Sequence, residues 1–101
     1  ACGGLCIASH VDRPAYSLIG NLGFIPPDLD IDGIEVSFRV PLSRARQSVN
    51  GIAGYPCVTA SDAHFLKDIG RAWYGLQAAS PCFAELRMAL KGENGRKIIA
   101  N

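Results

Sequence analysis

Long apolar runs are missing from this sequence, and none approaches the ~20 residues that a membrane-spanning helix requires. An excess of one charge is missing too, since ten basic and nine acidic residues leave a formal net charge of +1. The charge therefore does not indicate nucleic acid or a membrane as a partner. With 49% hydrophobic and 19% charged residues in a chain of 101, we expect one folded domain over residues 1–101.

A Cys-x-x-Cys pair is also absent, although the chain has four cysteines: Cys2, Cys6, Cys57 and Cys82. Cys6 and Cys57 lie inside apolar runs, where a free thiol behaves as a small hydrophobic side chain. We therefore expect a reducing, cytoplasmic location. The four-residue spacing of Cys2, Cys6 and His10 would suit zinc, but the segment has strand composition, so a cysteine-ligated zinc domain is only a third alternative.

The chain lacks an opening secretory signal, which would show a charged segment followed by an apolar one. It also begins at Ala1 and not at a methionine. We therefore expect either a processed protein or a piece of a longer one.

Residues 56–64 (PCVTASDAH) combine a short run of strand composition with polar residues at its end. Asp62 and His64 are separated by one residue, so a carboxylate and an imidazole can converge on one cation. This oxygen and nitrogen pair suits Mn, Fe or Zn better than Ca. In the alternative interpretation, Asp62 caps a turn and His64 lies in solvent.

Apolar periodicity and turn residues predict the remaining helices and strands. Strands are expected over residues 5–10, 31–37, 57–60 and 73–78, and Ile98 and Ile99 either add an edge strand or fray. Helices are expected over residues 15–22 with Gly23 as the stop, from Pro41 to Asn50 and Gly51, and from an N-cap at Ser80, with Pro81 in the first turn and Phe83 facing inward, to Gly92.

Three apolar strands separated by helical segments are typical of a parallel sheet with βαβ crossovers. Polar side chains fall at or near the carboxyl ends of all three strands: His10 after the first, Glu35 in the second, and Asp62 with His64 after the third. Because the carboxyl ends of parallel strands lie on one rim, these residues are expected to share a site.

Residues 8–14 (ASHVDRP), 32–36 (DGIEV) and 59–64 (TASDAH) together resemble the later part of the polymerase and histidinol phosphatase (PHP) family of metal-dependent phosphoesterases. The resemblance runs from about residue 3 to residue 91. It implies an α/β fold, a partial (β/α)7 barrel of mostly parallel strands, with two or three Mn, Zn or Fe ions in the complete barrel. His10 matches the third-motif ligand, and Asp62 and His64 match those of the fourth motif.

By this resemblance, the activity is metal-assisted hydrolysis of a phosphate ester, on a phosphorylated small molecule or a nucleotide. Arg13 follows His10 on the same loop, and its planar guanidinium suits two phosphate oxygens, so we predict that it binds the phosphate. Alternatively, Arg13 forms a surface ion pair with Asp12 or Asp30. Lys67 and Arg71, after His64, are expected to line the mouth of the site.

The family's first motif, a His-x-His, is absent, because the chain has two histidines in all. The sequence therefore resembles the C-terminal portion of a family member, and the chain is expected to be a poor enzyme alone. A homo-oligomer or a missing N-terminal half of the barrel would complete the site. The alternative is a non-catalytic PHP-derived interaction or regulatory module.

Overall fold

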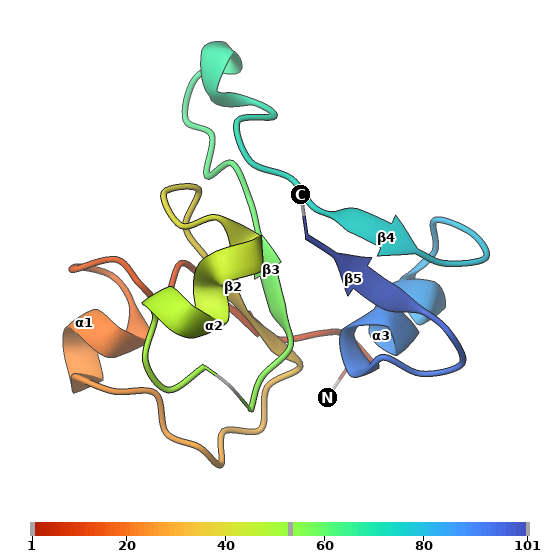
Figure 1. Cartoon of the computed structure of the whole chain (residues 1–101), viewed down its shortest axis with the longest axis horizontal. Coiled ribbons are helices and arrows are strands. Elements are labelled where there is room, and N and C mark those ends of the chain that lie inside the picture. Colours follow the sequence, from red (N-terminus) through yellow and green to blue (C-terminus); the bar gives the residue numbers. More distant parts are fainter. Residues whose placement is uncertain (1, 53, 101) are drawn as a thin grey trace.

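A three-stranded parallel sheet organises the first part of the chain in the computed structural model, which describes residues 2–52 and 54–100. Its strands are β1 (Ile7–Ala8), β2 (Gly33–Val36) and β3 (Cys57–Thr59), in the order β1-β2-β3 (Figure 1). Ala8 pairs with Ile34, and Val36 pairs with Thr59. The predicted parallel arrangement is confirmed, with strands shorter than the apolar runs that predicted them.

Two helical segments connect these strands. Helix α1 (Leu18–Leu22) begins after Ser17, whose hydroxyl accepts from Gly20 N, and ends at Gly23, which adopts φ 78° as the predicted glycine stop requires. The helix expected from Pro41 forms only in part. A 3-10 turn, η1 (Leu42–Arg44), runs into a four-residue α2 (Ala45–Ser48), so one regular helix does not form.

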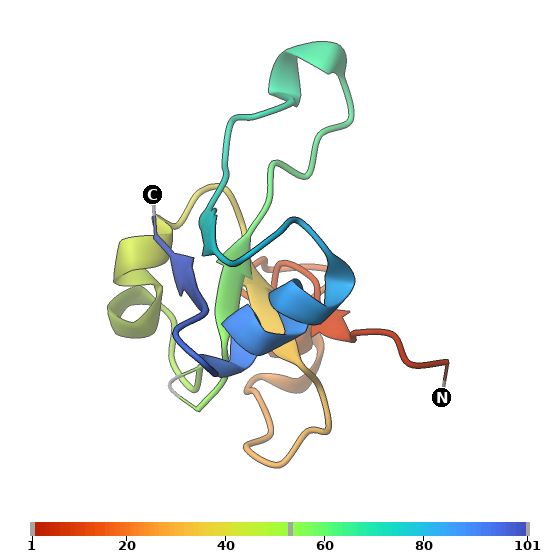
Figure 2. The same cartoon turned by 90° about the vertical axis from the view of Figure 1, so that its right-hand side faces the viewer.

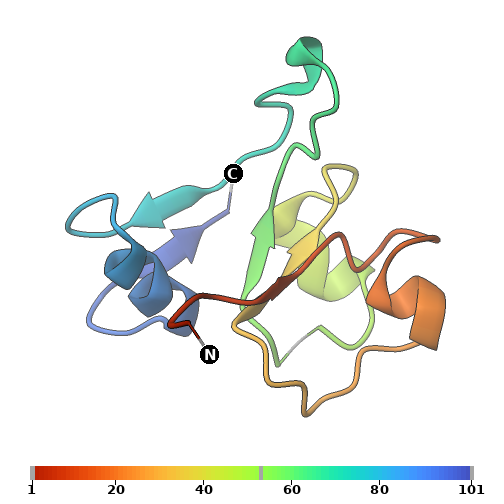
Figure 3. The same ribbon diagram turned by 180° about the vertical axis from the view of Figure 1, so that it is seen from behind.

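The C-terminal part is an antiparallel strand pair packed on a helix. Strands β4 (Gly75–Gln77) and β5 (Lys97–Ile99) pair with each other, so the predicted edge strand at Ile98 and Ile99 forms. Helix α3 (Phe83–Lys91) lies between them in the sequence and contacts both strands (Figure 3). It ends at Gly92 with φ 69°, as predicted.

The start of α3 differs from the prediction. Cys82, and not Ser80, is the N-cap residue, and the Ser80 hydroxyl donates to Cys82 Sγ at 3.5 Å. The inward position expected for Phe83 is also wrong, because this residue is 50% exposed. The guanidinium carbon of Arg87 lies over the Phe83 ring, 5.3 Å from its centroid.

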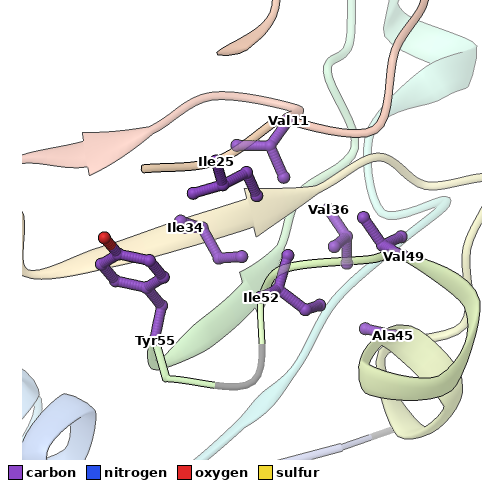
Figure 4. Packing of buried hydrophobic residues seen from close by; sticks show 8 residues of the cluster. All are labelled: Val11, Ile25, Ile34, Val36, Ala45, Val49, Ile52 and Tyr55. Atoms are coloured by element: carbon purple, nitrogen blue, oxygen red, sulfur yellow. The ribbon is translucent and has the colours of Figure 1, made fainter. Parts of the chain in front are cut away.

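The hydrophobic core lies between one face of the parallel sheet and the segments that cross it (Figure 4). Ile34 and Val36 point to this face because side chains alternate along a strand. They meet side chains from α2 and the loops, and the cluster contains Val11, Ile25, Ile34, Val36, Ala45, Val49, Ile52 and Tyr55. The strand order makes β2 the central strand, and its Ile34 and Val36 belong to this core.

The described strands form an open sheet and no closed barrel, so the partial barrel implied by the resemblance is not confirmed. Instead, β4 and β5 form a separate two-stranded sheet. A loop of residues 61–72, here called the projecting loop, extends away from the rest of the molecule and contains the 3-10 turn η2 (Leu66–Asp68) (Figure 2). In residues 2–52 and 54–100, no helix has the length and apolarity to cross a bilayer.

Candidate functional site

The loop after β1 is held against the end of β2 by backbone and carboxylate hydrogen bonds. The backbone N–H of His10 donates to Glu35 Oε1 at 3.2 Å, and Val11 N donates to Glu35 O at 2.9 Å. Glu35 was predicted to lie at the same rim, and its carboxylate accepts a hydrogen bond from the main chain of His10. The two predicted strand ends do meet.

Asp12 fixes the next part of this loop. Its two carboxylate oxygens accept from the backbone N–H and the hydroxyl of Ser37, both at 2.6 Å. Ser37 is buried, and Ser17 donates its hydroxyl to Arg13 O. A carboxylate bound at both oxygens in this way orients the loop that carries His10 and Arg13.

Arg13 reaches from this loop to the loop after β3. Its Nη1 atom lies 3.1 Å from Asp62 Oδ2, and the two side chains are 39% and 26% exposed. The surface pairing with Asp12 or Asp30 is therefore not the arrangement seen. Since β1 and β3 flank β2, this contact spans the carboxyl end of the central strand.

The Asp62–His64 pair has a defined hydrogen-bond arrangement. His64 Nδ1 lies 2.9 Å from Asp62 O, and a carbonyl oxygen only accepts, so Nδ1 carries the proton. In this tautomer of the imidazole, Nε2 has a free lone pair. Histidine ligands of metals commonly donate their other ring N–H to such a carbonyl. The side chain of His64 is 71% exposed, so Nε2 is accessible.

His10 and Asp62 share an uncommon backbone conformation. Their φ angles are 25° and 48°, in the left-handed region that L-residues with side chains rarely adopt. His10 Nδ1 is buried and has no hydrogen-bond partner among the described residues. His10 thus combines an uncommon backbone conformation with an unsatisfied polar atom, two features that often mark functional sites.

These side chains suit a divalent metal by their chemistry, but the structure does not bring three of them together. An imidazole with an unpartnered nitrogen, a carboxylate and a second imidazole match the chemistry of Mn, Fe and Zn sites. Nevertheless, residues 2–52 and 54–100 contain no group of three or more His, Cys, Asp or Glu side chains placed to hold a metal ion. The structure places Asp62 beside His64, and it does not gather His10 with them.

The sequence missed the role of Arg71, which was expected to line the mouth. Its Nε donates to Ser61 O at 2.7 Å and its Nη2 to Asp62 O at 3.1 Å. The guanidinium carbon also lies 3.5 Å from the centroid of the Phe38 ring. No local motif in the sequence announces these contacts. Lys67 is exposed in η2.

The four cysteines are free thiols, and they belong to no metal-ligating group within the described part of the chain. Burial raises the pKa of the Cys57 thiol, with Arg46 acting in the opposite direction. This thiol borders a hollow of about 500 Å³ at the amino end of β3, and Leu90 and Ile98 also line this hollow. The cysteine-ligated zinc alternative therefore gains no support. The hollow lies at the amino end of β3, whereas the candidate site lies at the carboxyl ends of the strands.

Comparison with known proteins agrees with the predicted resemblance. Residues 50–94 match the family model described as PHP-associated. The chain is also 38% identical over 104 residues to an uncharacterized protein, YqxK, from Bacillus subtilis (strain 168). The match covers 98% of this chain and 27% of that protein, so the chain spans about a quarter of the relative's length. No solved structure matches the chain.

Proposed function

We propose that the chain supplies part of the site of a PHP-type metal-dependent phosphoesterase, because residues 50–94 match the family model described as PHP-associated. The contact between Arg13 and Asp62 carries this proposal. The contact supports the proposal because it brings the guanidinium that would bind phosphate beside the carboxylate that would bind metal, at the strand ends where parallel α/β folds carry their chemistry.

In this proposal, Asp62 and His64 would ligate a divalent Mn, Zn or Fe ion together, and His10, which the structure does not gather with them, would be a ligand in the complete barrel. Such ions, two or three in the complete barrel, would supply a nucleophilic water at neutral pH and neutralise charge on the phosphoryl group. The chain's own contribution is orientation. The Asp62 carbonyl keeps the proton on His64 Nδ1, and the Glu35 carboxylate holds the backbone of His10.

Arg13 would bind the phosphate of the substrate, a phosphorylated small molecule or a nucleotide. Its contact with Asp62 uses Nη1, and its side chain is 39% exposed, so the other guanidinium donors can reach a ligand. A planar guanidinium can bind two phosphate oxygens at once. Arg13 thus supplies orientation and charge stabilisation for phosphoryl transfer.

The remaining ligands must come from outside these three residues. We propose that they come from a preceding half of the barrel in a longer polypeptide or from a second copy of the chain. The four free thiols support the cytoplasmic location that we propose for the protein.

Titration of the chain with Mn²⁺ by calorimetry tests the site. We expect weak binding that Asp62→Asn and His64→Ala abolish, because an incomplete ligand set holds metal poorly. Asp28→Asn is the matched control, since Asp28 is an exposed carboxylate in the loop that precedes the amino end of β2. Binding that is equal in the wild type and in Asp62→Asn would count against the proposal, as would no binding at all.

The alternative, a non-catalytic PHP-derived interaction or regulatory module, is favoured by one observation. The projecting loop exposes the large apolar side chains of Phe65 (69%), Leu66 (88%) and Ile69 (69%). Exposed apolar clusters commonly mark contact surfaces. Absence of Mn²⁺ binding together with loop-dependent association would favour this alternative over the phosphoesterase.

A further inference from the structure

We propose that Arg71 is a positioning residue of the candidate site, which sets the proton position and the direction of His64 through the Asp62 carbonyl. Nothing in the sequence motifs assigns this role to Arg71. The inference extends the proposed function, on which its meaning for metal binding rests. The positioning itself is a property of the chain without metal.

Hydrogen bonds close the neck of the projecting loop, where residue 61 meets residues 70–72. Ser61 Oγ accepts from Gly70 N at 3.0 Å and from Ala72 N at 3.4 Å, and donates to Ala72 O at 3.1 Å. Arg71 Nε adds a bond of 2.7 Å to Ser61 O. The two chain segments are therefore closed on each other next to Asp62.

The Asp62 carbonyl accepts hydrogen bonds from two side chains. Arg71 Nη2 lies 3.1 Å from this oxygen and His64 Nδ1 lies 2.9 Å from it. Asp62 has φ 48°, a conformation that costs free energy unless its surroundings hold it. Arg71 holds the carbonyl where His64 needs an acceptor, so the proton stays on Nδ1 and Nε2 remains free.

Phe38 and Asp68 hold the Arg71 guanidinium in place. Its guanidinium carbon lies 3.5 Å from the centroid of the Phe38 ring, and its Nη1 lies 3.5 Å from Asp68 Oδ1. A planar guanidinium can stack on a ring while donating in its own plane to two carbonyls, whereas an ammonium group cannot. Lysine therefore keeps the charge at this position but loses the function.

The test is the tautomer of His64, measured by long-range ¹H–¹⁵N correlation spectra at an alkaline pH where the ring is neutral. The chain has two histidines, so a His10→Asn variant assigns the signals. In the wild type we expect His64 to carry its proton on Nδ1. In Arg71→Lys and Arg71→Ala, the ratio of the Nδ1–H to the Nε2–H form should fall about five-fold, as expected for loss of one hydrogen bond.

Arg39→Lys is the matched control, because Arg39 lies over the same Phe38 ring at 5.6 Å. It should leave the tautomer ratio unchanged. If Arg71→Ala does not fold, Arg71→Lys decides. A wild-type His64 with its proton on Nε2, or an unchanged ratio in Arg71→Lys, would overturn the inference.

Mn²⁺ affinity separates this inference from the proposed function. If both hold, Arg71→Lys should bind Mn²⁺ several-fold more weakly than the wild type. A wild type that binds no Mn²⁺ contradicts the phosphoesterase proposal, and the tautomer measurement still decides the role of Arg71. A tautomer shift without a change in a measurable Mn²⁺ affinity would overturn the link between Arg71 and the metal site.

Discussion

Arg13 and Asp62 form a 3.1 Å ion pair although 49 positions separate them in the sequence. The pair joins the loops after β1 and β3, which are not neighbours in the sheet. Arg13, on the loop after β1, therefore holds the carboxylate of Asp62, on the loop after β3.

Replacement of Arg13 tests its predicted role in phosphate binding. Arg13→Gln should lower the affinity for inorganic phosphate, measured by calorimetry with Mn²⁺ present, by about ten-fold, since hydrogen bonds to charged groups are worth about 1.5–3 kcal/mol. Its effect on stability should stay below about 1 kcal/mol, because the pair is partly exposed. Arg39→Gln is the control, and an equal loss in that variant would show a nonspecific charge effect.

Catalysis by the chain alone should be poor. With an aryl phosphate and added Mn²⁺, we expect turnover far below that of an intact phosphoesterase, because the described residues hold no three-donor metal group. Release of phosphate over time measures this. Turnover comparable to that of an intact enzyme would show that the chain is sufficient by itself.

Acid should destabilise the C-terminal part through Glu85. Arg96 donates to both carboxylate oxygens, at 2.8 and 3.1 Å, and with Ala79 N–H it lowers the pKa of Glu85 below its usual 4.5. A lowered pKa stabilises the fold above the usual value, and this stability is lost as the pH falls through the folded-state pKa. Urea midpoints measured from neutral pH to below 4.5 should therefore fall less steeply in Glu85→Gln.

Glu93→Gln provides the control for this measurement, because Glu93 is exposed just after α3. Its urea midpoints should follow the wild type at every pH. If Glu85→Gln also follows the wild type, the pair with Arg96 does not contribute to acid sensitivity.

Self-association is the fourth expectation. The outer edges of β1 and β3 have no strand partner in the described sheet, and open edges and apolar clusters favour association. Sedimentation should show a concentration-dependent increase in mass that Leu66→Glu reduces, since Leu66 is 88% exposed. Lys67→Glu, at the next position, controls for charge. A strictly monomeric chain at high concentration would contradict this expectation.

The sequence predicted those parts of the fold that depend on local chemistry. Apolar β-branched runs predicted β2 and β3, and Gly23 and Gly92 predicted the helix ends, because a left-handed C-cap favours glycine. The convergence of three strand ends followed from parallel pairing alone. That rule placed Arg13 and Asp62 on the same rim before their contact was seen.

Contacts set by tertiary packing could not be predicted in the same way. Arg71 joins Phe38 to the projecting loop, and no periodicity connects residues so placed. Helix α3 begins later than predicted, with Cys82 as the N-cap residue, and the Ser80 hydroxyl donates to Cys82 Sγ. The ligand roles of His10, Asp62 and His64 stay predictions, because the structure shows their positions and not their binding.

The left-handed backbone at His10 and Asp62 has a consequence for directed evolution. Glycine, or asparagine, adopts such φ values at lower cost than most residues. A library selected for thermal stability alone would therefore enrich glycine at these two positions and remove the side chains proposed to bind metal. Selections for stability should accordingly hold both positions fixed, since here the fold and the chemistry favour different residues.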